Sequence, residues 1–121
     1  MNAQSMLHPA MSQIVDQFRT IAPGTLTSTF RSIEEQAQLR RNFELGRARF
    51  PAELPGNSTH HTGLSFDYVV RQGTSSPEQT ALGRAWNAAG GIWSERDRVH
   101  FQHPEAIAVL RAGLTRQRWW I

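Results

Sequence analysis

The side chains best suited to chemistry gather in two short windows of the sequence. Four of the five histidines and two well-separated aspartates lie in residues 58–67 and 90–103. Because the chain has no cysteine, it has no thiolate nucleophile, and any metal must be held by histidine and carboxylate side chains. A catalytic zinc ion takes three protein ligands and keeps one position open, so two histidines and one carboxylate are a sufficient set. His60, Asp67 and His100 could provide these ligands.

A turn must bring these ligands together. Fully extended, the stretch from His60 to Asp67 would span roughly 23 Å, whereas ligands of one ion lie about 3–4 Å from each other. Gly63 lies between them and tolerates the positive φ that a tight turn requires. We expect His61 and His103 to be neighbours of the site rather than ligands, because adjacent side chains on an extended chain point apart. The alternative is a hydrogen-bonded polar cluster without a metal.

The same two windows carry a resemblance to a known family. The patterns are Ser-x-His-x-x-Gly-x-x-x-Asp at 58–67 and Gly-Gly-x-Trp-x-x-x-Asp-x-x-His-Phe at 90–101. Together they resemble the zinc peptidases of the D-Ala-D-Ala carboxypeptidase superfamily. They look closest to the phage endolysins that cleave between L-alanine and D-glutamate in peptidoglycan stem peptides. Residues 30–36 are similar to the family's Tyr-Arg-Ser segment, so the likeness runs from about residue 25 to 103.

This resemblance implies a role for each residue of the site. It implies one zinc ion held by His60, Asp67 and His100, with Asp97 as general base and Arg31 binding substrate. The chemistry of the last two side chains suits these roles. A carboxylate three residues before a ligand can reach the water activated at the metal if the chain bends between them, and it can then return the proton to the leaving amine. The planar fork of an arginine binds a substrate carboxylate through two hydrogen bonds.

Other residues of the two windows have less defined roles or differ from the family pattern. Ser58 is expected to organise the loop or orient a ligand, and Trp93 to belong to the core or to bind substrate. Asp97 could instead be an exposed loop carboxylate paired with an arginine, and Arg31 a solvated strand end. The chain departs from the family at three positions, where relatives carry a small apolar residue or glutamate: Ser65, Gln102 and, outside the endolysin branch, Asp97.

The remaining sequence predicts the elements that must position these residues. Length places all 121 residues in one domain, 1–121, with residues 115–121 as a peripheral tail. Hydrophobic periodicity, capping residues and Gly/Pro punctuation predict helices at 9–21, 32–46, 77–89 and 104–114, and strands at 25–30, 64–70 and 92–101. Because helices and strands do not alternate strictly, we predict an α+β fold with a small, mainly antiparallel sheet flanked by about four helices.

Composition narrows the partners. All 13 basic residues are arginine and the net charge is only +3, so the high isoelectric point overstates the basicity, and we expect no nucleic-acid binding. No stretch approaches the roughly 20 apolar residues of a membrane span, and no signal peptide is evident. The Arg/Trp-rich end, 116–121, either binds an anionic wall polymer or membrane surface or docks on the domain.

These observations lead to one functional expectation and two rivals. We expect a monomeric, zinc-dependent L-alanyl-D-glutamate endopeptidase that degrades peptidoglycan for lysis of a bacterial wall. It would be made in the host cytoplasm and would reach the wall after release or as part of a virion. The first rival is a D,D-carboxypeptidase or dipeptidase acting on D-Ala-D-Ala. The second is a virion component that keeps the fold for binding or assembly.

Overall fold

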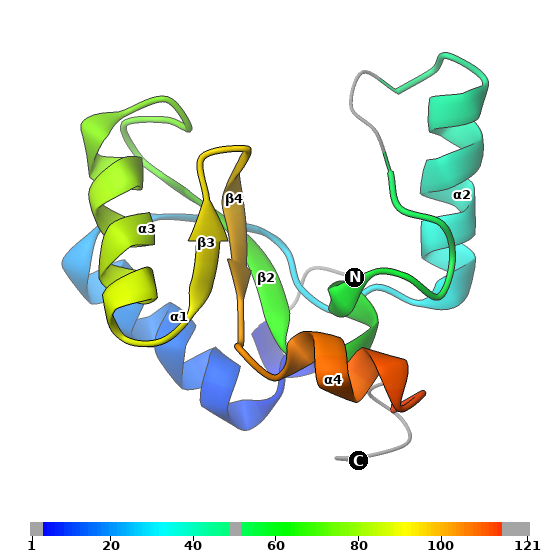
Figure 1. Ribbon diagram of the computed structural model, residues 1–121. Coiled ribbons are helices and arrows are strands. Elements are labelled where there is room, and N and C mark those ends of the chain that lie inside the picture. The colour runs from blue at the N-terminus through cyan, green and yellow to red at the C-terminus, as the bar shows by residue number, and fades with distance from the viewer. Residues whose placement is uncertain (1–3, 49–51, 115–121) are drawn as a thin grey trace.

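Four antiparallel strands form the centre of the fold (Figure 1). In residues 4–48 and 52–114, which the computed structural model describes, the sheet has the order β1-β2-β4-β3. The strands are β1 (Gly24–Ser28), β2 (Ser65–Val70), β3 (Ile92–Ser94) and β4 (Asp97–Gln102). The helices are α1 (Pro9–Ile21), α2 (Ile33–Glu44), α3 (Pro77–Ala88) and α4 (Ala106–Arg111), with short 3-10 helices η1 (Gln4–Met6) and η2 (Thr59–Thr62). The predicted α+β fold with a small antiparallel sheet is confirmed.

The two faces of the sheet have different roles. Successive side chains of a strand point to opposite faces, so Phe66 and Tyr68 of β2 face one way and Ser65 and Asp67 the other. The aromatic face is the core, where Phe18 of α1 packs edge-on against four rings at centroid distances between 4.8 and 6.1 Å: Phe66, Tyr68, Trp86 and Phe101. The polar face is therefore left free to carry a site.

The second helix stands apart from this core. Ser32 and Glu35 form the predicted capping box, in which each side chain accepts a hydrogen bond from the other's backbone N–H. Within α2 the only buried residue is Gln36, and Figure 1 shows the helix projecting away from the sheet. A helix with so little apolar burial gains little from the core, so we interpret α2 as the wall of a cleft.

The predicted strand region 92–101 is in fact a hairpin. β3 and β4 pair antiparallel, with Ser94 opposite Asp97, and Glu95 and Arg96 form the turn between them. The sequence analysis missed this turn because it has none of the glycine or asparagine residues that mark most two-residue hairpin loops. As a result, Asp97 is the first residue of β4.

The ends of the other elements differ modestly from the predictions. β1 ends at Ser28 rather than at 30, and α4 covers only Ala106–Arg111 rather than 104–114. Before α4, the Glu105 N–H donates a hydrogen bond to His103 Nδ1, and after it Gly113 has φ 74°, which ends the helix. The predicted tail, 115–121, lies outside the described residues. None of the described helices combines the length and the apolar character that a membrane crossing requires.

Candidate metal centre

The short helix η2 carries His60, the first of the three candidate ligands. Ser58 is its N-cap, and the Ser58 Oγ accepts a hydrogen bond of 3.2 Å from the backbone N–H of His60. Gly63 ends the helix with φ 75° and so turns the chain back into β2. The fold-back predicted at Gly63 is therefore present, and Ser58 organises the loop through the backbone of His60.

The sheet carries the other two candidate ligands. Asp67 of β2 and His100 of β4 are direct cross-strand partners. Side chains of such a pair lie on the same face of a sheet, here the polar face. His60 from η2 lies over this pair, with its ring centroid 5.2 Å from that of His100. Three segments far apart in the sequence thus meet at one place.

The separations of the three ligand atoms fit a metal ion. His60 Nε2 and His100 Nδ1 each lie 3.3 Å from Asp67 Oδ1, and all three atoms lie within 4.8 Å of one another. Ligand atoms about 2.1 Å from a tetrahedral zinc ion lie ~3.4 Å apart, which matches both histidine–aspartate distances. A charged N–H···O hydrogen bond is typically shorter, about 2.7–2.9 Å. These two distances therefore fit a shared cation, and in its absence they are those of two long ion pairs.

The opposite nitrogen of each ring is already engaged. His60 Nδ1 donates a hydrogen bond of 2.7 Å to the backbone oxygen of Thr29. His100 Nε2 lies 2.9 Å from Gln102 Oε1, which can only accept, so this nitrogen carries the hydrogen. In the neutral rings, the lone pairs of His60 Nε2 and His100 Nδ1 then point toward Asp67. Two lone pairs and a carboxylate converging on one point are the donor set that a divalent cation stabilises.

Electrostatics within this group keep the carboxylate ionised. Burial alone would raise the pKa of Asp67, but hydrogen bonds from His100 and His60, together with their charges, outweigh burial and hold this pKa well below its usual range. Burial would likewise lower the pKa of His100, yet its hydrogen bonds to Asp67 and Gln102 raise it. Without a metal, these contacts therefore favour the protonated form of His100.

Asp97 lies beside this group. Asp97 and His100 line the same cleft, although regular alternation would place side chains three positions apart on opposite faces. The pairing of β4 with β2 ends at the Asp67–His100 pair, and the Arg98 carbonyl instead accepts hydrogen bonds of 2.7 Å from Gln79 Nε2 and Trp93 Nε1. The first half of β4 thus pairs only with β3, and the register of that pairing shifts between Ile92 and Ser94.

The surroundings of Asp97 suit a proton acceptor. Asp97 is an exposed residue at the start of β4, as the alternative from the sequence expected, but its carboxyl faces the cleft and is partly buried. This partial burial raises the pKa of Asp97; the nearby His100 opposes the rise, and the negative charge of Asp67 adds to it. A carboxylate with a raised pKa is a stronger base, so Asp97 is better placed than an ordinary surface aspartate to accept a proton.

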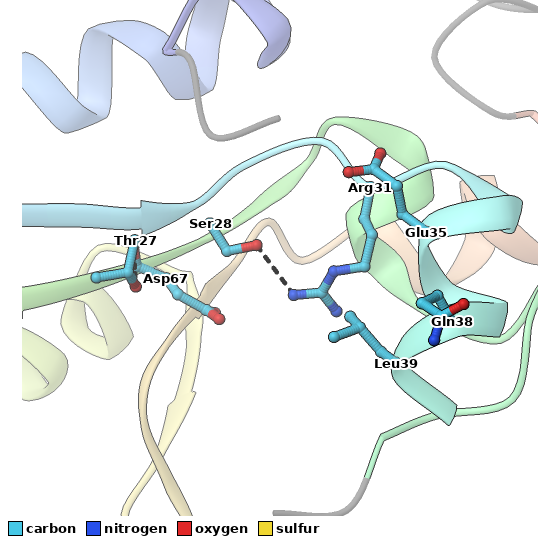
Figure 2. A pocket seen from close by; sticks show the side chains of 7 residues that line it. All are labelled: Thr27, Ser28, Arg31, Glu35, Gln38, Leu39 and Asp67. Carbon is cyan, nitrogen blue, oxygen red and sulfur yellow. Dashed lines mark hydrogen bonds between the residues drawn. The ribbon is translucent and has the colours of Figure 1, made fainter. Parts of the chain in front are cut away.

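Arg31 borders the same space from the far side. Its guanidinium donates hydrogen bonds of 2.9 Å to Gln36 Oε1 and 3.0 Å to Ser28 Oγ. Figure 2 shows the side chain reaching toward Ser28 in a pocket that Leu39 and Asp67 also line. Arg31, the residue predicted to bind substrate, is therefore held in place near the ligand group. It is not a freely solvated strand end.

A large cleft connects these parts. Its volume is about 1170 Å³, and it is lined by Arg31, Asp97 and the three ligand residues. Its other walls come from α2, from residues 52–58, from the turn between β3 and β4, and from α4. The space is large enough for a peptide of several residues, because pockets for small ligands are typically about 300–1000 Å³.

Three residues singled out in the sequence analysis, Trp93, His61 and His103, are not part of the candidate ligand group. Trp93 is in the hydrophobic core and only 7% exposed, so it does not form a substrate platform in the cleft. Its ring nitrogen donates a hydrogen bond to the backbone oxygen of Arg98, the residue that follows Asp97. His61 is buried and bonded to backbone groups, and burial lowers its pKa. His103 bonds to the start of α4.

The sequence analysis did not recognise the side chains that orient the ligands. It noted Gln102 only as a departure from a family pattern, whereas Gln102 fixes the tautomer of His100. It gave no role to Gln36, which is 1% exposed and bonds Arg31 to the backbone oxygen of Glu53. Gln102 and Gln36 lie only two and five residues from the side chains that they contact, but residue types and spacing alone do not show that these side chains meet.

Comparison with known proteins identifies the fold. No protein-family model and no curated protein sequence matches the chain. The L,D-carboxypeptidase DacB from Streptococcus pneumoniae has a similar structure, with TM-score 0.56 and 21% identity over 94% of this chain and 72% of that one. The LD-carboxypeptidase LdcB, reported with the basis of its peptidoglycan recognition, gives TM-score 0.65 and 18% identity over 91% of this chain and 66% of that one.

A third neighbour was solved with a metal. A mutant of the D,D-pentapeptidase VanY from a VanB-type vancomycin resistance cassette, in complex with Zn(II), gives TM-score 0.57 and 16% identity over 90% of this chain and 78% of that one. VanYB has also been solved in complex with D-alanine-D-alanine. The chain therefore shares the fold of these L,D- and D,D-peptidases.

Proposed function

We propose that the protein is a zinc-dependent peptidase that hydrolyses a peptide bond in peptidoglycan stem peptides. The observation that carries this proposal is the convergence of His60 Nε2, Asp67 Oδ1 and His100 Nδ1 at separations that fit a zinc ion, in a cleft that also holds Asp97 and Arg31. The fold shared with L,D- and D,D-peptidases and the Zn(II) complex of VanY support it.

Each residue then has a defined task. Zinc would supply a Lewis acid that polarises a carbonyl group and acidifies water. Asp97 accepts a proton from the attacking water and returns it to the leaving amine. Arg31 binds a carboxylate of the substrate, and its guanidinium is preorganised by Ser28 and Gln36. No side-chain nucleophile is required.

The finer proposal concerns the bond that is cut. We propose cleavage between L-alanine and D-glutamate, because the patterns at 58–67 and 90–101 look closest to those of the endolysin branch. The alternative is a carboxypeptidase that releases a terminal D-alanine, which the similarity to DacB, LdcB and VanY supports equally. Arg31 fits both, since each substrate offers a carboxylate beside the scissile bond.

Metal content tests the site. His60→Ala and His100→Ala should each lose zinc and hydrolytic activity, because each removes a ligand. His103→Asn is the matched control: it changes a nearby histidine outside the ligand group and keeps an acceptor for the Glu105 N–H. Metal analysis of the purified proteins and turnover of stem peptides are measured together. Retention of zinc by both ligand variants would contradict the proposal.

Product analysis separates the two bonds. Purified stem peptides are incubated with the zinc-loaded protein, and the products are identified by mass spectrometry. An endopeptidase releases a peptide beginning with D-glutamate and also cuts a substrate whose C-terminal carboxyl is amidated. A carboxypeptidase releases D-alanine and fails on the amidated substrate. Release of D-alanine alone would overturn the L-alanyl-D-glutamate assignment.

A further part of the proposal concerns where the protein acts and its oligomeric state. We propose that the protein acts as a monomer on the bacterial wall, either after release from the host cytoplasm or as part of a virion. A virion component without catalysis is the competing hypothesis, and it requires that saturating zinc produce no hydrolysis. Light scattering of the pure protein tests the monomer, and immunodetection in purified particles tests the virion route.

A further inference from the structure

One buried histidine of the site region has no role in the mechanism proposed above. His61 directly follows the ligand His60 and is only 1% exposed, yet it is not part of the ligand group. Its Nδ1 lies 2.6 Å from the backbone oxygen of Arg31, and its Nε2 lies 3.1 Å from the backbone nitrogen of Gly56. The carbonyl can only accept and the amide can only donate, so one neutral tautomer, with the hydrogen on Nδ1, satisfies both contacts.

These contacts link η2 to the segment that carries Arg31. The adjacent rings of His60 and His61 donate hydrogen bonds to the carbonyls of Thr29 and Arg31, which are two residues apart on one connection. The N–H of Arg31 also donates to the His60 carbonyl, at 3.2 Å. Both backbone polar groups of Arg31 are therefore hydrogen-bonded to the two histidines. These bonds fix the position of the Arg31 backbone relative to His60.

The second contact of His61 reaches a wall of the cleft. Gly56 belongs to residues 52–58, several of which line the cleft beside Arg31 and His60. The other end of this segment is held by α2, through Gln36 Nε2 to the Glu53 carbonyl at 2.7 Å and Arg40 Nη1 to the Ala52 carbonyl at 3.0 Å. His61 provides the attachment at the Gly56 end, next to the ligand group.

We propose that His61 is a positioning residue that fixes Arg31, and with it the cleft wall at Gly56, at a set place relative to the metal centre. Through Arg31 it governs substrate binding, and it contributes little to metal retention or to proton transfer by Asp97. This proposal rests on the proposed function, since it takes Arg31 as the carboxylate-binding residue.

The test compares variants that keep different contacts. His61→Leu removes both contacts, His61→Asn keeps a donor near the place of Nδ1, and His61→Gln keeps an acceptor near the place of Nε2. We expect His61→Leu to raise KM about ten- to a hundredfold, because small displacements of a binding group have effects of this size. Its kcat and its zinc content should stay close to those of the unmodified protein. His61→Asn should recover more of the KM than His61→Gln, because the Arg31 contact needs the donor.

A double-mutant cycle with Arg31→Ala separates positioning from general loss of structure. If His61 acts through Arg31, the His61→Leu and Arg31→Ala effects on KM are strongly non-additive. Additive effects, loss of zinc from His61→Asn, or better recovery by His61→Gln would each overturn the proposal. His103→Asn serves as the histidine control, with unchanged KM.

A readout without turnover keeps this test separate from that of the proposed function. In ¹⁵N NMR spectra of the zinc-loaded protein, His61 should show a hydrogen on Nδ1, and His61→Asn should leave the Arg31 amide protected from exchange while Gly56 loses protection. A His61 hydrogen on Nε2 would refute the inference even if the enzyme is active. Absence of hydrolysis by the unmodified protein would instead refute the proposed function.

Discussion

Substitution of Asp97 by asparagine is the sharpest test of the proposed chemistry. The two side chains have nearly the same shape, and the backbone pairing of residue 97 with Ser94 does not depend on the side chain. The variant therefore keeps the turn between β3 and β4 and the three ligand residues. It loses only the ability to accept a proton, because an amide is not basic in the neutral range.

The structure sets the expected size of this effect. General base catalysis contributes about 10²–10⁴ in rate, which corresponds to about 2.7–5.4 kcal/mol of activation free energy at about 1.36 kcal/mol per factor of ten. Asp97 is exposed and only partial burial of its carboxyl raises its pKa, so we expect a loss of kcat within that range. Zinc content should not change, because Asp97 is outside the ligand group.

The pH dependence gives the same prediction a sign. Asp97 must be ionised to accept a proton, so kcat/KM should fall as the pH drops through its pKa. Because burial raises this pKa, the fall begins above the ordinary aspartate value of about 3.9. Asp97→Asn should lack this dependence, and Asp97→Glu, which restores a carboxylate, should regain part of the rate.

The assay measures kcat, kcat/KM and bound zinc for the three proteins on one defined stem peptide. Loss of zinc from Asp97→Asn would show that Asp97 is a ligand and not a base. Activity within about tenfold of the unmodified protein would show that proton transfer does not need this carboxylate. Either result would refute the assignment of Asp97 as the base.

Three further predictions concern the metal centre and the core. Gln102→Leu removes the acceptor that fixes the His100 tautomer, so competition with a chelator should show about 10- to 100-fold weaker zinc binding, and unchanged affinity would contradict that role. The contacts that raise the pKa of His100 make protons compete with zinc for this side chain. The zinc affinity should therefore fall by about tenfold per pH unit and per displaced proton as the pH drops through that pKa. Calorimetric titration across neutral pH measures this change, and an affinity that does not vary with pH would argue against the ligand role. Gly83→Ala would place a Cβ 2.1 Å from the buried Trp93 ring. Urea unfolding should therefore show a free energy of unfolding lower by about 1–2 kcal/mol, even after the helix-propensity gain of alanine. A more stable variant would contradict this packing.

The sequence was most informative where the chemistry is local. Ser32 with Glu35, and Ser76 with Pro77, marked two helix starts because capping depends on residues within one turn. Alternating residues at 64–70 predicted the strand that became β2, since the period of a strand is also short. The sequence was least informative at the turn formed by Glu95 and Arg96, whose residue types carry little turn preference.

The ligand group itself was accessible from residue types alone. In a chain without cysteine, histidines and aspartates concentrated in two windows limit the ways in which a metal could be held. The same reasoning could not choose between a metal and a polar cluster, because that choice depends on distances between atoms. Separations of 3.3 Å from Asp67 Oδ1 to both imidazoles fit the metal.

What the sequence determined by itself was the set of side chains able to do chemistry and the fold class that holds them, since both follow from residue type and short-range periodicity. Only the tertiary structure decided which nitrogen of each histidine faces Asp67, why Asp97 turns into the cleft, and how His61 holds Arg31. These features depend on hydrogen bonds between segments as far apart as Thr29 and His60, or Gln79 and Arg98. Such bonds form only after the sheet has brought those segments together, so no local pattern encodes them.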